Sequence, residues 1–260
     1  MRASCGVRLQ GPGEAGMQAQ PGNQVIVGCC GWRKSHAEYY RHFGLIELQQ
    51  TFYRPPQEKT AERWRREAPA EFIFTLKAWQ LITHEPYQPT YLRGKIDIPR
   101  AEWEQYGSFR PTRPVLAAWE RTLTLAHILE SPVIVFQCPP QFGPTPFNIA
   151  NMRRFFSLID RTGLVFAWEP RGNWPDEQVA ELCAELNLVH CVDPFLRATV
   201  TTGMDYFRVH GGPDYTHKFT DNELEQLAGR VRQPYTVFCL FNNTEMWDDG
   251  LRFKNLLKNP

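Results

Sequence analysis

The sequence has no long apolar run, little net charge and none of the common metal-binding spacings. Its apolar stretches fall far short of the ~20 residues that a membrane-spanning helix needs, so we expect a soluble protein with no membrane partner. A formal net charge of +1 over 260 residues argues against a basic nucleic-acid coat protein and against an acidic tail. No HxH, HExxH or DxD spacing occurs, and we predict neither a bound metal nor a cofactor.

The cysteine pattern lacks the signs of disulfide bonding. The seven cysteines are an odd number, contain no CxxC spacing and lie mostly inside apolar runs such as VIVGCCG and TVFCLF. This pattern is typical of reduced, buried thiols, and it predicts a cytoplasmic protein. Cys29 and Cys30 are adjacent, and adjacent side chains of a strand point to opposite faces, which argues against a redox pair.

The first 22 residues, MRASCGVRLQGPGEAGMQAQPG, contain no apolar block. They are rich in Gly, Gln, Pro and Ala, and they lack the continuous apolar core of a secretory signal. We therefore predict a disordered leader over 1–22 and a single folded domain over 23–260, with Met17 as an alternative start.

From Val25 onward, short apolar runs alternate with longer helix-like segments. The runs are mostly rich in β-branched or aromatic residues, which is typical of strands buried on both faces of a parallel sheet. Eight strands alternating with helices predict an α/β fold, a single closed (β/α)₈ barrel of the TIM type. A doubly wound sheet is the competing fold, but no GxGxxG follows the first run to support it. The predicted strands are 25–27, 45–48, 72–76, 133–136, 164–168, 188–192, 206–209 and 236–241, and the predicted helices are 58–67, 115–129, 148–159, 176–186, 221–231 and 251–257.

The segment 79–114 interrupts this alternation. It contains five prolines and several aromatic residues, and it follows the third predicted strand. In a barrel this position lies at the C-terminal rim, where long loops are usually functional. A disordered insertion would contain fewer aromatic residues, so we predict a folded lid.

Polar side chains close the predicted strands from the second to the eighth. The carboxyl ends of the strands of such a barrel meet at one rim, where the active sites of this fold lie. Burying many charged or amide groups is costly unless they are paired, so together they predict a functional pocket. The strand-end residues are Glu47, Lys77, Gln137, Glu169 with Arg171, Asp193, Arg208 with His210, and Asn242, while Trp32, Thr51, Tyr53, His84 and Trp174 follow shortly after strands.

These residues also have structural interpretations. Glu169 and Arg171 lie two apart on a strand and share a face, so they could form a buried ion pair. Glu47 could pair with Lys77 or with an arginine in the barrel core. A structural pair predicts that Glu169→Gln loses roughly 3–5 kcal/mol of stability, whereas a catalytic acid predicts a melting temperature near that of the wild type. The position of Glu169 at a strand end favours the catalytic interpretation.

Eight strings, in order along the chain, resemble a known family. They are GCCGW, ELQQTFYRPP, the lysine of FTLKAWQLITHE, VFQCPPQF, WEPRGNW, VDPF, YFRVHGG and LFNN. They resemble the YecE-like family, domain of unknown function 72, in the branch whose fifth motif reads EPRG, and the resemblance covers about 25–257. It implies a TIM barrel, and it leaves the activity open because the family has no established one.

The rim residues suit general acid–base chemistry on a small anionic or sugar-like substrate. Arginines offer the fork geometry that binds phosphate or carboxylate, and a lysine adds a point charge. We predict an enzyme (a hydrolase, lyase or isomerase) whose partner is a small anionic or polyhydroxylated molecule. The predicted catalytic residues are Glu169, His210, Lys77 and Glu47, and the predicted substrate-binding residues are Arg171, Arg208, Tyr53, Thr51, His84, Gln137, Asp193, Asn242, Trp32 and Trp174.

Two other functions fit parts of the sequence. Glu47, Glu169, Asp193 and His210 could hold a divalent metal, as in barrel nucleases and isomerases, although the neighbouring arginines would repel it. The basic stretch 63–66 could bind nucleic acid. Helices with mixed Arg and Glu are usually solvated faces with i,i+4 pairs, so nucleic acid is the less favoured partner.

Overall fold

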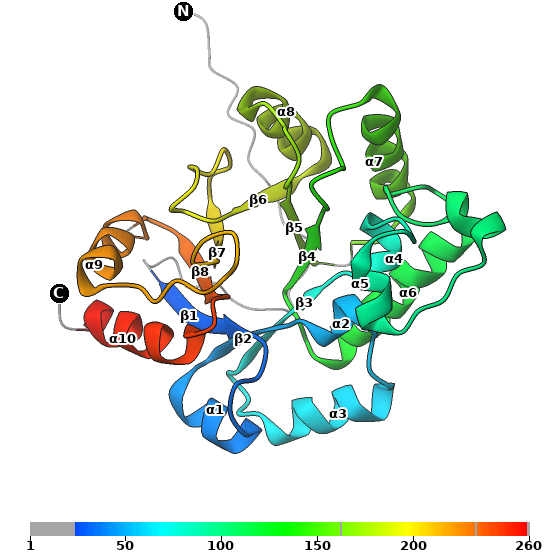
Figure 1. The fold of residues 1–260 in the computed structure, drawn as a ribbon. Helices are drawn as coiled ribbons and strands as arrows, with labels where there is room; N and C mark the ends of the chain where they lie inside the picture. Colours follow the sequence, from blue (N-terminus) through cyan, green and yellow to red (C-terminus); the bar gives the residue numbers. More distant parts are fainter. Residues whose placement is uncertain (1–23, 162, 232, 259–260) are drawn as a thin grey trace, which may run out of the picture.

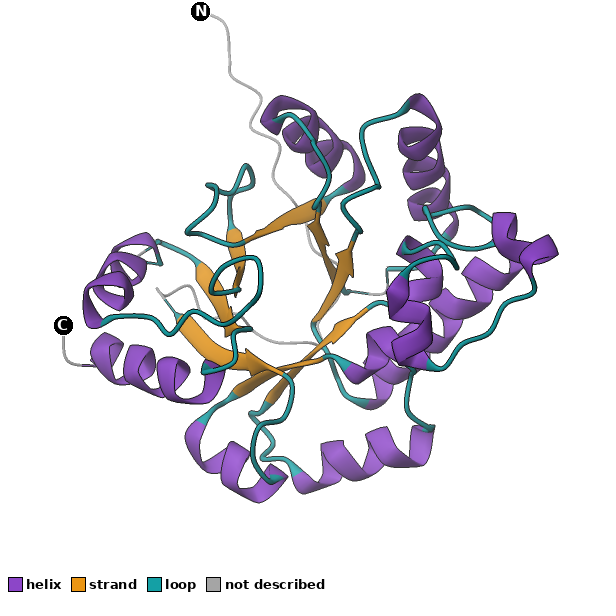
Figure 2. Cartoon of the chain, in the orientation of Figure 1, coloured by secondary structure: helices purple, strands orange, loops and turns teal. Residues whose placement is uncertain are grey.

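The computed structural model of the protein describes residues 24–161, 163–231 and 233–258. Eight parallel strands close into a barrel in their order along the chain, and the last strand pairs with the first (Figure 1). Helices surround this barrel on the outside (Figure 2). The predicted (β/α)₈ fold is confirmed. The predicted leader, 1–22, lies outside the described residues.

All eight predicted runs form strands, although several extend beyond the predicted ends. The largest change is in the first strand, which continues through the glycine and both cysteines that follow the apolar run. The strands are β1 (Val25–Cys30), β2 (Leu45–Leu48), β3 (Ile73–Lys77), β4 (Val133–Gln137), β5 (Val165–Glu169), β6 (Leu188–Val192), β7 (Met204–Val209) and β8 (Thr236–Phe241).

The six predicted helices are present, α3 and α8 with the predicted bounds and the other four with shifted ends, and the described residues form five short helices that the sequence did not predict. The longer ones are α3 (Glu58–Glu67), α6 (Arg113–Ile128), α7 (Pro146–Leu158), α8 (Asp176–Leu186), α9 (Asp221–Arg230) and α10 (Met246–Lys258). The additional ones are α1 (His36–His42), α2 (Gln50–Tyr53), α4 (Gln80–Thr83), α5 (Pro89–Gly94) and the 3₁₀ helix η1 (Arg100–Gln105). Each has seven residues or fewer, too few to show a clear helical period. Within the described ranges, no helix is long and apolar enough to cross a membrane.

Side chains alternate between the barrel interior and the surrounding helices along the strands. The outward residues pack on the helices: on β4, for example, the ring of Phe136 stacks on Trp119 of α6. Cys29 faces outward and Cys30 inward, as predicted, and the described cysteines are free and buried. The buried interior cluster consists of Cys30, Leu45, Val133, Val135, Ala167, Cys191, Tyr206, Phe238 and Leu240.

A glycine permits the close approach of β1 and β2 near the site. A Cβ atom at Gly28 would lie 2.3 Å from the carbonyl oxygen of Leu45, far inside van der Waals contact. Any larger residue would push the two strands apart. Gly28 therefore allows β1 and β2 to lie this close together just before Cys30, where the interior opens into the site.

The segment 79–114 is folded and contains α4, α5 and η1. Aromatic residues contribute to its core contacts, as its composition suggested, together with Leu81 and Ile82. Tyr91 is 2% exposed and donates a hydrogen bond to the carbonyl oxygen of His84 at 2.9 Å, while Phe109 is fully buried among other rings. The segment therefore packs onto the barrel at the rim that follows β3.

Candidate active site

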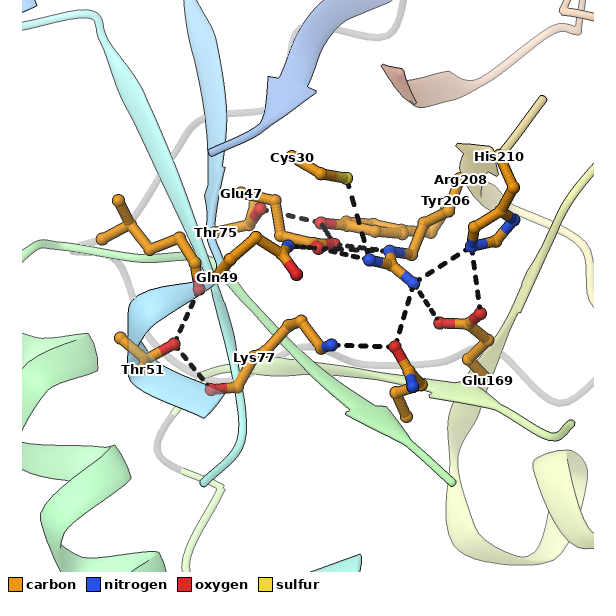
Figure 3. Close-up of polar contacts among 12 residues, drawn as sticks. Cys30, Glu47, Gln49, Thr51, Thr75, Lys77, Glu169, Tyr206, Arg208 and His210 are labelled. Atoms are coloured by element: carbon orange, nitrogen blue, oxygen red, sulfur yellow. Dashed lines mark hydrogen bonds and ion pairs between the residues drawn. The ribbon is translucent and has the colours of Figure 1, made fainter. Parts of the chain in front are cut away.

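The barrel interior changes from apolar to charged at the carboxyl ends of the strands. On β5, Ala167 is followed two residues later by Glu169, and on β7 Tyr206 is followed by Arg208. Because residues two apart on a strand share a face, these charged groups must point into the barrel as well. Lys77 ends β3 in the same way. Figure 3 shows that these side chains converge from different strands on one place.

Arg208 lies at the centre of this cluster and is 1% exposed. Its Nε is 3.1 Å from both carboxylate oxygens of Glu47, and its Nη1 is 2.5 Å from Oε2 of Glu169. Burial opposes its charge, but the carboxylates of Glu169 and Glu47 hold the pKa of Arg208 well above its ordinary value. The sequence left open whether Glu47 pairs with Lys77 or an arginine, and its partner is Arg208.

The Tyr206 hydroxyl bonds to Glu47 and is itself held by the Thr75 hydroxyl. The Tyr206 hydroxyl lies 3.0 Å from Oε2 of Glu47 and 2.7 Å from the Thr75 hydroxyl. Burial raises the pKa of Tyr206 well above its usual range, so its phenol stays protonated and donates to the carboxylate. With Arg208 on one side and this hydroxyl on the other, both oxygens of Glu47 are hydrogen-bonded.

Arg171 extends the network toward the opening of the barrel, and its side chain is 26% exposed. Its Nε donates to Oε1 of Glu169 at 2.8 Å, and its Nη1 donates to the Tyr215 hydroxyl at 2.6 Å. The predicted pairing of Glu169 with Arg171 is therefore present, with Arg208 as a second partner. Although burial acts in the opposite direction, the guanidinium groups of Arg171 and Arg208 hold the pKa of Glu169 well below its usual range.

His210 lies among two carboxylates and two guanidinium groups. Its Nδ1 is 3.3 Å from Oδ2 of Asp193, and its Nε2 is 2.8 Å from Nη2 of Arg171 and 3.3 Å from Nη1 of Arg208. The same Nε2 lies 3.4 Å from Oε1 of Glu169. A guanidinium has only donors, so toward the two arginines Nε2 accepts, and the proton of a neutral ring is then on Nδ1, facing Asp193. Asp193 thus orients a histidine whose basic nitrogen faces the charged cluster.

Lys77 differs from the arginines in having no carboxylate partner among the described residues. Its Nζ donates to Oε1 of Gln137 at 2.8 Å and lies 4.0 Å from the centre of the Phe52 ring. Burial, together with the charge of Arg208, lowers the pKa of Lys77 to about 7, against the weaker opposite effect of Glu47 and Glu169. At neutral pH a substantial fraction of Lys77 is therefore an uncharged amine.

These side chains line a cavity of about 580 Å³ at the rim, a size suited to a small molecule. Its wall includes five basic side chains, and none of the described residues on it is acidic. Glu47 and Glu169 neutralise Arg208 from behind the wall. Aromatic rings and amides complete the surface, which contains Trp32, Phe52, Tyr53, Tyr215, Gln49, Gln50, Gln137, Asn242 and Asn243 beside Arg33, Lys77, Arg93, Arg171 and Arg208.

The cavity wall includes about half of the residues proposed from the sequence. They are Lys77, Arg171, Arg208, Tyr53, Gln137, Asn242 and Trp32. Glu47, Glu169 and His210 lie directly behind them and bond to Arg208 or Arg171. Asp193 in turn accepts a hydrogen bond from the backbone N–H of His210.

Three proposed residues have their polar atoms bonded elsewhere. Thr51 Oγ1 lies 2.7 Å from the carbonyl oxygen of Lys77, where it fixes the end of β3. Trp174 Nε1 donates to the carbonyl oxygen of Phe142 at 2.7 Å. His84 is 3% exposed, and its Nδ1 is 2.9 Å from the hydroxyl of Thr83. These contacts are structural, and the structure does not bring the three side chains to the cavity wall.

Sequence reasoning missed several residues of the wall. Arg33 and Gln49 come directly after β1 and β2, so the rule that sites lie after barrel strands could have found them. Arg93 comes from α5 in the segment after β3, and Tyr215 comes from the loop after β7. No local pattern marks these two, because their loops fold back to the rim from a distance in sequence.

Fold and site together define a TIM-barrel protein with a basic cavity at the carboxyl ends of its strands. The chain belongs to the family described as protein of unknown function DUF72, whose sequence profile matches residues 26–258. The UPF0759 protein YunF of Bacillus subtilis (strain 168) is 27% identical over an alignment 281 residues long, gaps included, and the alignment covers 90% of this chain and 94% of that protein. The resemblance noted from the sequence motifs is confirmed.

Solved structures share the fold. A DUF72 family protein from Enterococcus faecalis V583 has a TM-score of 0.72 at 19% identity, covering 93% of this chain and all of that one (100%). A D-tagatose 3-epimerase-like protein has a TM-score of 0.52 at 14% identity, covering 90% of this chain and 96% of that one. At these identities the likeness concerns the fold alone.

Proposed function

We propose that the protein is an enzyme that binds a small anionic or polyhydroxylated substrate in the rim cavity and transforms it by general acid–base chemistry. The observation that carries the proposal is the composition of the cavity wall, with five basic side chains and no carboxylate among its described residues. Arg171 and Arg208 offer planar donor groups, which suit phosphate or carboxylate oxygens. Trp32 and Tyr53 offer ring surfaces against which a sugar ring could pack.

Lys77 is the acid–base group that faces the cavity. A catalytic group transfers protons best when its pKa is near the working pH, and the pKa of Lys77 is about 7. His210 supplies a second basic nitrogen, Nε2, which is bonded to the guanidinium of Arg171. An anion that binds this guanidinium would replace that bond and leave Nε2 free to accept a proton. Glu169 and Glu47 then serve as positioning residues, because they contact the arginines rather than the cavity.

The metal-dependent alternative finds less support in the geometry. A divalent metal needs several oxygen or nitrogen ligands around an open position. Here the guanidinium of Arg208 lies between Glu47 and Glu169 and bonds to both. In the described part of the chain, no three His, Cys, Asp or Glu side chains are grouped as metal ligands. We therefore propose no metal-dependent reaction.

Several of the arginines on which the nucleic-acid alternative depends are paired with acids. Arg63 lies 3.8 Å from Glu67, one helical turn away, and Arg153 binds Glu185 at 2.8 Å. Such pairs are typical of solvated helix faces, and they leave little unbalanced charge for a phosphate backbone.

The first test is anion binding. Inorganic phosphate should raise the melting temperature of the wild type relative to chloride at the same ionic strength, because a ligand that binds only the folded state stabilises it. Arg171→Gln should weaken phosphate binding about tenfold or more, since a charged hydrogen bond contributes about 1.5–3 kcal/mol. Isothermal titration calorimetry measures the affinity.

Arg153→Gln is the matched control, because Arg153 is an exposed arginine that also pairs with a glutamate. Its phosphate affinity should equal that of the wild type. Equal affinities in the Arg171 and Arg153 variants, or no binding by the wild type, would contradict an anion site in the cavity.

The second test is activity. A panel of phosphorylated sugars and hydroxy acids, followed by proton NMR, should contain a compound that the wild type converts. Lys77→Met and His210→Asn should each lower its turnover by about 10²–10⁴-fold, the usual contribution of a general acid or base. Lys59→Met, at an exposed position on α3, should retain full turnover. A conversion that survives Lys77→Met would show that the chemistry lies elsewhere.

A further inference from the structure

Lys77 presents an amine to the cavity in surroundings that favour nucleophilic attack. It is 3% exposed, it lines the cavity, and its Nζ has one hydrogen-bond acceptor, Oε1 of Gln137. The face of the Phe52 ring lies 4.0 Å from it. A lysine whose role was to hold a structural carboxylate would show an ion pair, and none joins Lys77 to an acid in the described ranges.

The charges around Lys77 come from three other strands and the loop after β5. Arg208 and Arg171 disfavour its protonated form, and Glu47 and Glu169 favour it, with burial as the largest effect. The net result is an amine with an available lone pair near neutral pH, and such lysines attack carbonyl carbons. The buried imidazole of His84 experiences the charge of Lys77 in turn, which helps to lower the pKa of His84 to about 3, after the larger effect of burial.

The side-chain amide of Gln137 bonds to both the amine of Lys77 and the guanidinium of Arg208. Oε1 of Gln137 accepts from Nζ of Lys77 at 2.8 Å and from Nη1 of Arg208 at 3.2 Å. A small molecule whose anionic group rests against Arg208 and Arg171 therefore has its next atoms close to the lysine nitrogen. Gln137 can also accept a hydrogen bond from, or donate one to, a hydroxyl formed there.

We propose that Lys77 forms an imine with the carbonyl carbon of an aldehyde or ketone substrate that carries a phosphate or carboxylate. The proposal rests on the proposed function and narrows it to carbonyl compounds. The nitrogen lone pair of Lys77 attacks the carbonyl carbon, and the oxygen takes up a proton to give a carbinolamine. Loss of the nitrogen proton and of the hydroxyl as water then forms the C=N bond, so amine and carbonyl yield imine and water with no oxidant or reductant.

An imine draws electrons from the bonds next to the former carbonyl carbon when its nitrogen is protonated. This weakens a neighbouring C–H or C–C bond, which is the chemistry of lyases and isomerases rather than hydrolases. His210 could then receive a proton from such a bond. The inference thus selects two of the three reaction classes that the sequence left open.

The test traps the imine by reduction. The folded protein is incubated with glycolaldehyde phosphate, glyoxylate or neutral glycolaldehyde in the presence of sodium cyanoborohydride, and the modified lysines are identified by peptide mass spectrometry. We expect Lys77 to be labelled at least tenfold faster by one of the anionic aldehydes than by glycolaldehyde. Exposed lysines such as Lys59 should show no such preference. The faster of the two anionic reagents tells whether the site takes phosphate or carboxylate.

Two variants and one competitor keep the result interpretable. Lys77→Arg retains the charge and removes the nucleophile, so the labelled peptide should disappear. Arg171→Gln retains the nucleophile, so Lys77 should still react but lose its preference for the anionic reagents. Inorganic phosphate should slow the labelling of Lys77 and leave that of Lys59 unchanged.

The labelling rate of Lys77 should also rise between pH 6 and 8 as the amine loses its proton. If phosphate binds in the cavity but Lys77 is not labelled, or is labelled with no preference for the anionic aldehydes, the imine is refuted and the anion-binding proposal stands. If phosphate does not bind and Lys77 does not react, both proposals are wrong.

Discussion

Glu169→Gln is expected to lower the free energy of unfolding by about 3–5 kcal/mol, the cost of removing one partner from a buried ion pair. Its carboxylate is the link between Arg171, at 2.8 Å, and Arg208, at 2.5 Å, and its side chain is 5% exposed. Glutamine can accept from one guanidinium, but its amide nitrogen must then face the other. The position of Glu169 at a strand end, taken alone, favoured a stability of Glu169→Gln near that of the wild type. Arg208, the second arginine bound to Glu169, reverses that expectation.

Urea denaturation at pH 7 measures this loss. The control is Glu185→Gln, which removes a glutamate that also binds an arginine, Arg153, but whose side chain is 43% exposed. Exposed pairs contribute at most about 1 kcal/mol, so this variant should unfold almost as the wild type does. Equal stabilities of the two variants would show that Glu169 is not a structural link in the network.

Acid should weaken the same network. The pKa of Glu169 is held below that of the unfolded chain, so its charge stabilises the fold at pH values above the unfolded pKa. That contribution is lost as the pH falls through the folded-state pKa. The difference in stability between wild type and Glu169→Gln should therefore be largest near neutral pH and shrink in strong acid.

Lys77→Met is expected to make the protein more stable at pH 6 by about 2–5 kcal/mol. The pKa of Lys77 falls from 10.5 in the unfolded chain to about 7 in the fold, mainly because the amine is buried. The unfolded state therefore binds more protons between these values, and the stability of the wild type rises with pH across that window. Below pH 7 folding has to bury the protonated amine of Lys77. This costs about 1.4 kcal/mol for each unit of difference between the unfolded and the folded pKa.

The same variant should lose most of its advantage as the pH approaches 10.5, because above that pH Lys77 is mostly uncharged in both the folded and the unfolded state. Urea denaturation at pH 6, 8 and 10 follows the change. Lys59→Met is the control, since Lys59 is exposed on α3 and its replacement should alter stability by no more than about 0.5 kcal/mol at each pH. A pH-independent effect of Lys77→Met would mean that the lysine is not held uncharged by burial.

Which residues form the charged cluster could be predicted largely from where the strands end. Glu169 ends the fifth apolar run, and the strand ends of a barrel meet at one rim, so its place at the rim followed from the sequence. Its direction into the barrel follows from Ala167, two residues earlier, which the structure shows in the interior. The same rule applies to Lys77 and to Arg208. The order of the strands followed from their number and their alternation with helices, because parallel strands linked by helices close into a barrel in sequence order.

The partners of these groups could not be derived in the same way. Arg208 could have paired with any acid of the rim, and it bonds to Glu47 and Glu169 because barrel closure brings β2, β5 and β7 within reach of one guanidinium. Trp174 follows a strand, as site residues do, but its indole bonds to the carbonyl oxygen of Phe142. The sequence shows that such a residue follows a strand. It does not show whether the polar atoms of its side chain already have hydrogen-bond partners.

The sequence alone determined the fold and the residues at the rim, since these depend on the alternation of short apolar runs with helical segments and on which residues end those runs. Only the tertiary structure decided which of those residues form the cavity wall. Arg93 and Tyr215 reach it from separate loops, while Glu47 and Glu169 lie behind Arg208. The physical reason is that contacts between distant residues depend on the register and tilt of all eight strands, which no local pattern encodes.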